Sequence, residues 1–262
     1  MTEVEAPATL FASGGGAGTP ALVLLHGLGA NATVWEPLRS MLDEHWRGRW
    51  IAPDLRGHGR SPFRGPYGFG VHAADVATLL PQDAEAVMVG HSMGGVVAMA
   101  LGAGSFGIRL RAILAFGVKL AWTSEEVEKL RRLAEAPVRF FERREEAIDR
   151  YLRVAGLKGL VNPNSPAASV GVMEKREGFC VAVDPLAYAV VGTDIAAIAS
   201  ACRAPLRLAA GSGDPMVTAV QMRAIDPHAV VLDGLGHNPH VEAPDRFWRL
   251  LQSTLAALRL PR

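Results

Sequence analysis

Residues 85–104 read EAVMVGHSMGGVVAMALGAG, an apolar run and a small-residue run separated by a serine among glycines. The first run has the length and composition of a buried strand, and the second is typical of a helix. Gly90, Gly94 and Gly95 leave room for a sharp turn because they carry no side chain. The stretch therefore predicts a strand, a tight turn that presents Ser92, and a helix whose positive end faces that turn.

Other apolar runs bounded by Gly, Pro and Asp have the same strand-like length, at 21–27, 49–54, 111–117, 205–211 and 228–234. Near-continuous apolar strands of this kind are typical of a parallel sheet that is buried on both faces. Stretches long enough for crossover helices separate the first four strands, at 35–46, 71–80 and 96–103. This alternation predicts an α/β fold with a mostly parallel, doubly wound sheet.

Residues 120–190 interrupt this alternation. Thr123 and Glu126 stand in capping-box spacing at the start of a helical pattern over 123–137. A second helical pattern covers 138–156, and strand character returns only after residue 190. Inserts of this length are often functional.

The insertion divides the chain into two parts. We expect a core domain made of residues 1–119 and 191–262, with residues 120–190 forming an inserted helical lid or cap. Such a lid would lie over the carboxyl ends of the strands, where sites in α/β sheets are found. The alternative is that the inserted helices simply pack on one edge of the sheet.

The hexapeptide GHSMGG contains the pattern G-x-S-x-G between a predicted strand and a predicted helix. In this context a nucleophilic serine is exposed on a strained strand-to-helix turn. The alternatives are a glycine-rich turn with an incidental serine, and a phosphate-binding loop. His91 is adjacent to Ser92, but successive side chains at a strand end point in opposite directions, so His91 is not the expected base. The base must come from a distant part of the chain.

His237 and Asp214 each follow a late predicted strand, and the carboxyl ends of parallel strands meet at one edge of a sheet. His237 lies in the loop after the last strand, where His240 is its nearest competitor. Asp214 follows the predicted strand at 205–211. The rival position is the end of the strand at 111–117, but the first carboxylate after that strand is Glu125, several residues further on. An imidazole here would accept the proton of a serine, and a carboxylate would orient it. Capping of the following helix is the alternative role of the aspartate.

Five motifs in this order resemble the α/β-hydrolase superfamily over nearly the full chain: HGLG (26–29), DLRGHGRS (54–61), GHSMGG (90–95), GSGD (211–214) and GLGHNPHVEAPDRF (234–247). The chain order Ser92, Asp214, His237 is also the order found in α/β-hydrolase enzymes. The resemblance implies that Ser92 is the nucleophile, that His237 is the general base and acid, and that Asp214 orients His237. It also implies an oxyanion hole formed by the backbone N–H groups of Leu28 and Met93.

The same resemblance implies a serine hydrolase. The sequence contains no H-E-x-x-H motif and no Cys/His cluster with zinc spacing, so we expect no cofactor or metal. The substrate would be a carboxylic ester, lactone or thioester of a small to medium, largely apolar acyl group, cleaved through an acyl-enzyme. Carbon–carbon hydrolysis of a meta-cleavage-type diketone and a non-catalytic ligand-binding or receptor role are the alternatives. We expect an apolar pocket lined by Trp122, Phe140, Phe141, Ile148 and Val217. Lys119 and Arg139, if turned inward, would instead favour an acidic substrate.

A dinucleotide site is the rival from a different class of protein. GLGANA (27–32) follows the first strong strand and matches G-x-G-x-x-A, and Asp54 ends the next strand, where a ribose-binding carboxylate would lie. This interpretation leaves the serine, aspartate and histidine motifs unexplained.

Two further segments have ordinary structural interpretations. RGHGRSP (56–62) is interpreted as a polar turn rather than an anion site. The tryptophans of the segment that follows GLGANA are interpreted as core and rim residues: Trp35, Trp46 and Trp50.

Composition narrows the classes of partner and location. The 27 basic and 26 acidic residues nearly cancel, so no basic field is available for a nucleic acid. The start, MTEVEAPATLF, lacks a signal sequence, and no apolar run approaches the roughly 20 residues of a membrane span. We therefore expect a cytoplasmic monomer or homodimer that acts on a small-molecule ester. Cys180 and Cys202 lack the spacing of a metal or redox motif and are expected to be reduced.

Overall fold

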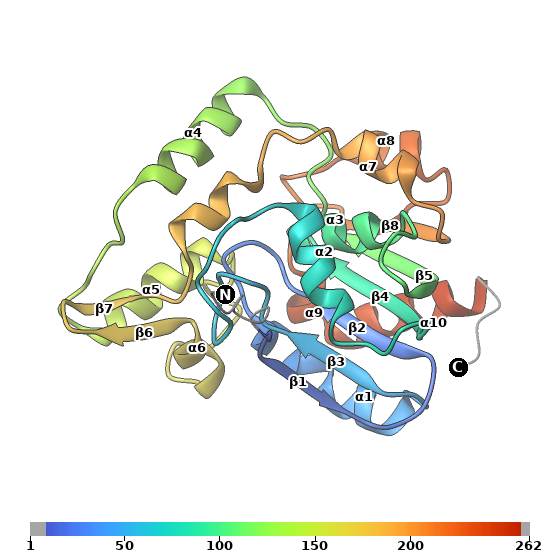
Figure 1. Cartoon of the computed structure of the whole chain (residues 1–262), viewed down its shortest axis with the longest axis horizontal. Coiled ribbons are helices and arrows are strands. Elements are labelled where there is room, and N and C mark those ends of the chain that lie inside the picture. The colour runs from blue at the N-terminus through green and yellow to red at the C-terminus, as the bar shows by residue number, and fades with distance from the viewer. Residues whose placement is uncertain (1–8, 258–262) are drawn as a thin grey trace, which may run out of the picture.

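The computed structural model describes residues 9–257. Most of the acidic start, on which the expected location depends, lies outside the described residues. The described chain is organised around a seven-stranded sheet in the order β1-β3-β2-β4-β5-β8-β9 (Figure 1). The strands are β1 (Ala12–Gly15), β2 (Ala21–Leu25), β3 (Trp50–Pro53), β4 (Glu85–His91), β5 (Arg109–Phe116), β8 (Leu206–Gly211) and β9 (Val230–Leu232). Only β1 runs antiparallel to its neighbour, which confirms the predicted mostly parallel sheet.

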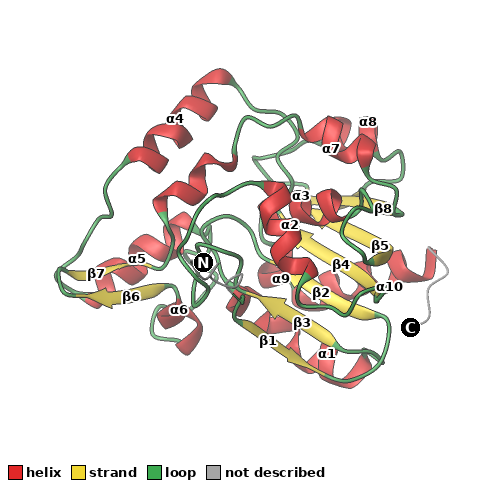
Figure 2. Cartoon of the chain, in the orientation of Figure 1, coloured by secondary structure: helices red, strands yellow, loops and turns green. Residues whose placement is uncertain are grey.

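Both faces of this sheet are buried, as β2 shows. Leu22 and Leu24 belong to one apolar cluster, whereas Val23 and Leu25 belong to the other, because successive side chains of a strand point to opposite faces. The first cluster is covered by η1 (Ala32–Leu38), α1 (Arg39–His45), α9 (Pro239–Glu242) and α10 (Pro244–Ala257). The second is covered by α2 (Phe69–Ala77), α3 (Met93–Leu101), α7 (Ile195–Ala201) and α8 (Ala219–Ile225) (Figure 2). The doubly wound arrangement is therefore confirmed.

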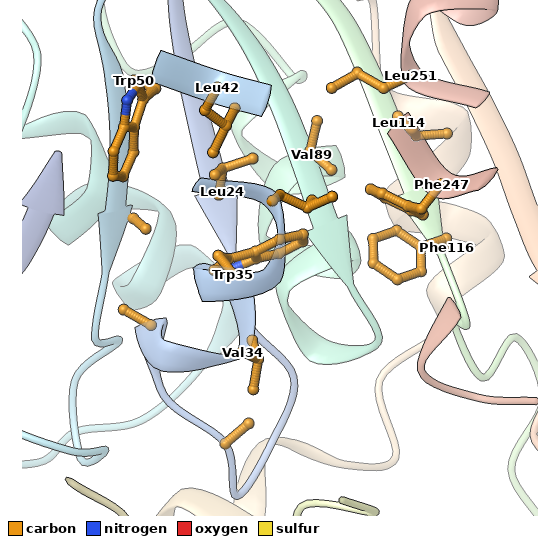
Figure 3. Packing of buried hydrophobic residues seen from close by; sticks show 14 of the residues in the cluster. Leu24, Val34, Trp35, Leu42, Trp50, Val89, Leu114, Phe116, Phe247 and Leu251 are labelled. Carbon is orange, nitrogen blue, oxygen red and sulfur yellow. The ribbon is translucent and has the colours of Figure 1, made fainter. Parts of the chain in front are cut away.

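An aromatic cluster packs beneath the carboxyl end of the sheet (Figure 3). The ring of Trp35 lies 6.1 Å from that of Phe116 at the end of β5, and Phe116 lies 4.6 Å from Phe247 of α10. Trp46 and Trp50 are also buried, so the tryptophans are core residues as interpreted. This packing joins the end of β5 to the chain segment that follows β9, and it supports the loops at that edge.

The segment between β5 and β8 is built differently. It contains α4 (Ser124–Glu135), α5 (Arg144–Val154), α6 (Pro166–Val170), the hairpin β6 (Val172–Lys175) with β7 (Gly178–Val181), and η2 (Pro185–Val190). Figure 1 shows α4 extending away from the sheet, with α5, α6 and the hairpin on the same side of the molecule. The predicted capping box is present: Thr123 Oγ1 accepts from the amide of Glu126, whose carboxylate accepts from the amide of Thr123.

Two features of this segment differ from the sequence-based expectation. The second helix begins at Arg144 and does not cover 138–143, because Phe141 is extended and exchanges two backbone hydrogen bonds with Phe179, of 2.8 and 2.9 Å. The β6–β7 hairpin is not predicted from the sequence. Its strands are four residues each, too short for a periodic pattern to stand out. Long-range pairing with the chain around Phe141 therefore overrides the local helical pattern.

Candidate active site

Ser92 occupies the turn between β4 and α3. Its backbone has φ 49° and ψ −114°, a conformation that is strained for a residue with a side chain. A Cβ atom on Gly90 would lie 2.4 Å from the carbonyl oxygen of Gly94, and one on Gly94 would lie 2.4 Å from the carbonyl oxygen of Leu25. Glycine at both positions is therefore required for α3 to approach the strands this closely. The amide of Ser92 also donates to the carbonyl of Phe116, at 2.8 Å.

His237 lies in the loop after β9, and its ring contacts the carboxylate of Asp214 after β8. His237 Nδ1 is 3.0 Å from Oδ1 and 2.9 Å from Oδ2 of Asp214, whose side chain is completely buried. An ionised carboxylate only accepts hydrogen bonds, so Nδ1 carries the proton and Nε2 is left free to accept one. Asp214 also accepts from the amide of Met216 at 2.8 Å, so a local turn role coexists with its contact to the imidazole.

A cavity of about 480 Å³ contains both Ser92 and His237 in its wall. Leu28, Met93 and Trp122, three further residues expected at the site, line it as well. Most of its remaining wall is apolar and comes from the sheet-end loops, the starts of α2 and α7, α3 and the inserted segment: Phe69, Val96, Leu130, Val154, Ala155, Val190, Val191, Ile195 and Met216. The sheet edge and the inserted segment together thus enclose a space suited to an apolar group.

The two amides expected to form an oxyanion hole come from different elements, one from a helix start and the other from a loop. Met93 is the first residue of α3, where an amide has no partner within the helix. Leu28 lies in the loop after β2, next to Gly27, where an added Cβ would come within 3.3 Å of the Ser92 Cβ. In the described part of the chain, neither amide donates to another backbone group outside regular elements. Both are therefore available to a ligand in the cavity.

Four of the five residues expected to line the pocket do not do so. The apolar face of α5 packs into the core, which buries Ile148. Phe141 is held by its pairing with Phe179, and Phe140 beside it is 37% exposed. Val217 is buried in the core cluster around α8, and its neighbour Met216 faces the cavity instead.

Several lining residues were missed by the sequence reading. Leu130 stands on the apolar face of α4, so the capping box and helical periodicity offered a signal for it. Tyr188 and Val190 come from η2, and Val154 comes from the end of α5. No sequence pattern marks these three positions, because they meet the cavity only through the folding of the insertion.

The two other histidines near the site are not placed to act as bases. His91 is buried, and its Nε2 is 2.9 Å from the carbonyl oxygen of His237, to which it donates. Burial holds the pKa of His91 well below its usual value. His240 is completely buried, with its ring 4.7 Å from that of Trp35 and 4.9 Å from that of His91. Burial lowers the pKa of His240 to about 3. The expectation that His91 packs rather than pairs with the serine hydroxyl agrees with this geometry.

Two of the three cationic lysine and arginine side chains that line the cavity, Lys119 and Arg153, have acidic partners. Lys119 Nζ lies 2.7 Å from Glu126 Oε1, and this contact lowers the pKa of Glu126. Arg153 Nε lies 2.8 Å from Asp149 Oδ2. Arg139 does not reach the cavity, because its guanidinium stacks on the ring of Phe141 at 4.9 Å. Of the two cations that would favour an acidic substrate, Lys119 therefore lines the cavity, paired with Glu126, whereas Arg139 does not.

The groups that suggested other ligands have partners within the protein. The buried carboxylate of Asp54 accepts hydrogen bonds from the amides of Ala32 and Arg60 and from the Arg60 side chain. It is therefore occupied within the protein and does not face a ribose. Among residues 9–257, no group of three or more His, Cys, Asp and Glu side chains could hold a metal ion. Cys180 and Cys202 are both free. No described helix has the length and apolarity to cross a membrane.

Comparison with known proteins assigns the class. The chain matches the model of the Alpha/beta hydrolase family over residues 22–250, and it belongs to that family. The solved structure of E-2-(acetamidomethylene)succinate hydrolase superposes with a TM-score of 0.77 over 94% of this chain and 95% of its own, at 23% identity. That likeness shows the shared fold.

Curated relatives match only part of the chain. Lipase LipV of Mycobacterium tuberculosis is 42% identical over 87 residues, which are 32% of this chain and 32% of the lipase. Pimeloyl-[acyl-carrier protein] methyl ester esterase of Pectobacterium atrosepticum is 43% identical over 91 residues, 35% of this chain and 34% of the esterase. The matches thus span about a third of the length of these relatives.

Proposed function

We propose that this protein is a serine hydrolase that cleaves a carboxylic ester, lactone or thioester of a small to medium, largely apolar acyl group. The observation that carries the proposal is the contact of His237 Nδ1 with both carboxylate oxygens of Asp214, in the wall of the cavity that also contains Ser92. The names of the partly matching lipase and methyl ester esterase support the same reaction class.

In the proposed first half-reaction, Ser92 Oγ bonds to the acyl carbon while its proton moves to His237 Nε2. The carbonyl electron pair moves onto oxygen, where the amides of Leu28 and Met93 stabilise the negative charge. His237 then donates that proton to the departing alkoxide or thiolate as the bond to the leaving group breaks. Asp214 stabilises the imidazolium between these two steps.

In the second half-reaction, water replaces the alcohol. His237 takes a proton from water as its oxygen bonds to the acyl carbon, and Ser92 Oγ leaves with that proton. The released carboxylic acid ionises at neutral pH. No cofactor or metal enters this sequence. A base that has to accept two protons in turn must be neutral at the start, so activity falls as His237 is protonated.

We further propose that residues 120–190 act as a lid on a core of residues 1–119 and 191–262. Trp122, Leu130 and Val154 support this role, because they come from the inserted segment and line the same cavity as the serine. Their apolar surfaces would favour an uncharged acyl chain through burial of its methylene groups, at about 0.8 kcal/mol each.

A fluorophosphonate probe and a panel of p-nitrophenyl esters test the proposal. We expect the probe to label Ser92, and Ser92→Ala to lose both labelling and ester turnover. Ser253→Ala is the matched control, since its hydroxyl bonds to the Leu250 carbonyl on α10, away from the site. Absence of turnover above the Ser92→Ala background, with rapid cleavage of a dienoic diketone, would replace ester hydrolysis by carbon–carbon hydrolysis. Binding of an ester without turnover of either substrate would indicate a receptor.

A further inference from the structure

The loop that carries His237 is held by a carboxylate that no catalytic step uses. Glu242, on α9, accepts two backbone hydrogen bonds: from the amide of Gly236 at 2.6 Å and from the amide of Asn238 at 2.8 Å. These two amides stand immediately before and after His237. One side chain therefore spans the histidine through its backbone, and bonds from amides to a carboxylate are among the stronger hydrogen bonds of a protein.

A second side chain fixes the carbonyl oxygen of His237 itself. His91 Nε2 donates to the carbonyl oxygen of His237 at 2.9 Å. Because a carbonyl oxygen only accepts hydrogen bonds, this contact requires the His91 tautomer with its proton on Nε2. The ring is wedged in place, since a Cβ on Gly27 would lie 2.8 Å from His91 Nδ1. In addition, Asn238 Nδ2 donates to the carbonyl oxygen of Gly156, in the inserted segment, at 3.1 Å.

These contacts matter because, besides Asp214, only packing holds the imidazole among the described residues: its ring lies 4.6 Å from that of His91 and beside Gly117. His237 lies outside any helix or strand, it follows a glycine, and its side chain is 23% exposed. Asp214 contacts only Nδ1 of the imidazole. If the loop backbone moved, small side-chain rotations would preserve that hydrogen bond while Nε2 moved away from the serine. A displacement of about 1 Å in a catalytic group is enough to cost on the order of 100-fold in rate.

We propose that Glu242 and His91 are positioning residues that clamp the backbone of His237, so that its imidazole keeps one position at the cavity wall. Glu242 fixes the amides on either side of the histidine, and His91 fixes its carbonyl oxygen. The inference rests on the proposed function, in which His237 transfers the protons. It assigns neither residue a contact with the substrate.

Glu242→Gln is the first test, because glutamine keeps the size of the side chain but has one acceptor oxygen, and its NH₂ group opposes the second amide. We expect kcat to fall about 10- to 100-fold with KM nearly unchanged. The downfield proton NMR signal of the His237–Asp214 hydrogen bond should broaden or disappear. Glu85→Gln is the matched control, since Glu85 pairs with Arg111 at the opposite end of β4 and should retain both kcat and the signal.

Rates are divided by the amount of protein that the fluorophosphonate probe labels at completion, which removes any effect of misfolded protein. If kcat per labelled site in Glu242→Gln equals that of wild type, the clamp is refuted even if the melting temperature falls. Failure of the proposed function is distinguishable, because Ser92→Ala would then retain the turnover of wild type.

A pair of His91 variants tests the other half of the clamp, and does so even if Glu242→Gln does not fold. Glutamine keeps an N–H donor for the carbonyl oxygen of His237, whereas leucine keeps only similar bulk. We expect His91→Leu to lower kcat by about 10-fold, and His91→Gln to recover most of that loss. Equal kcat in the two variants, whether high or low, would show that the donor to this carbonyl has no positioning role.

Discussion

The two sides of the cavity are built by different physical means. On the sheet side, β4 leads into Ser92 with every residue after Glu85 buried, and the turn admits only glycine at two positions. On the opposite side, α4 buries a single residue, Ala134, and contributes Leu130 to the cavity from a helix that is otherwise largely exposed. The groups that are proposed to perform the chemistry are thus held by many contacts, while the wall that α4 contributes to the cavity is held by few.

The electrostatic interactions follow the same division. In the insertion, Asp149 pairs with Arg153 and Lys158 on the surface, with all three side chains around half exposed. Exposed pairs of this kind contribute roughly 0–1 kcal/mol to stability. Asp214, by contrast, is completely buried against His237, and under the proposed function its removal would leave the base without orientation. Substitutions should therefore abolish catalysis on the sheet side and adjust substrate preference on the insertion side.

The largest effect expected within this comparison is that of Asp214→Asn on the sheet side. The amide favours the wrong imidazole tautomer, so turnover should fall by as much as about 10⁴-fold while the fold is retained. Steady-state ester hydrolysis and circular dichroism measure the two quantities. Asp233→Asn, an exposed carboxylate after β9, is the control and should stay near wild type. Activity within tenfold of wild type in Asp214→Asn would move the orienting acid elsewhere.

An intermediate effect is expected on the insertion side, from Leu130→Trp. The larger ring would occupy space in the cavity, so the ratio of kcat/KM for hexanoyl over acetyl esters should fall by about 10-fold or more, with acetyl turnover retained. Leu133→Trp on the same helix is the matched control, because Leu133 does not line the cavity. An unchanged ratio in Leu130→Trp would show that the acyl chain does not reach α4.

The smallest effect concerns stability beneath the sheet-end loops. Burial lowers the pKa of His240 from 6.5 to about 3, so the unfolded chain binds a proton there at higher pH than the folded protein does. This residue makes folding less favourable as pH falls from about 6.5 toward 3, by up to about 1.4 kcal/mol per pH unit, and has no effect above that window. In His240→Leu, the slope of the unfolding free energy against pH should decrease in this window by the contribution of one bound proton, up to about 1.4 kcal/mol per pH unit. Urea titrations from neutral to mildly acid pH measure it, and parallel slopes would contradict the assignment.

The sheet and its loops illustrate what local sequence can specify. The parallel strands read as apolar runs. Ser92 directly follows β4, and Asp214 and His237 lie in the loops that follow β8 and β9. Since parallel strands end at the same edge, adjacency of these residues follows from topology alone. The capping box at Thr123 is equally local, because both of its partners lie within one helical turn.

The insertion shows where that reasoning ends. Residues 138–143 carry a helical pattern, yet Phe141 pairs with Phe179, and Ile148 turns into the core rather than the cavity. The sequence by itself determined the six parallel strands, the order of the three polar residues and the family resemblance, because these depend on strand periodicity and on glycines in one turn. It did not predict the edge strand β1 (Ala12–Gly15). Only the tertiary structure decided which apolar residues face the substrate cavity and that Glu242 spans His237, because both depend on packing and hydrogen bonds between segments that the folding of the whole chain brings together.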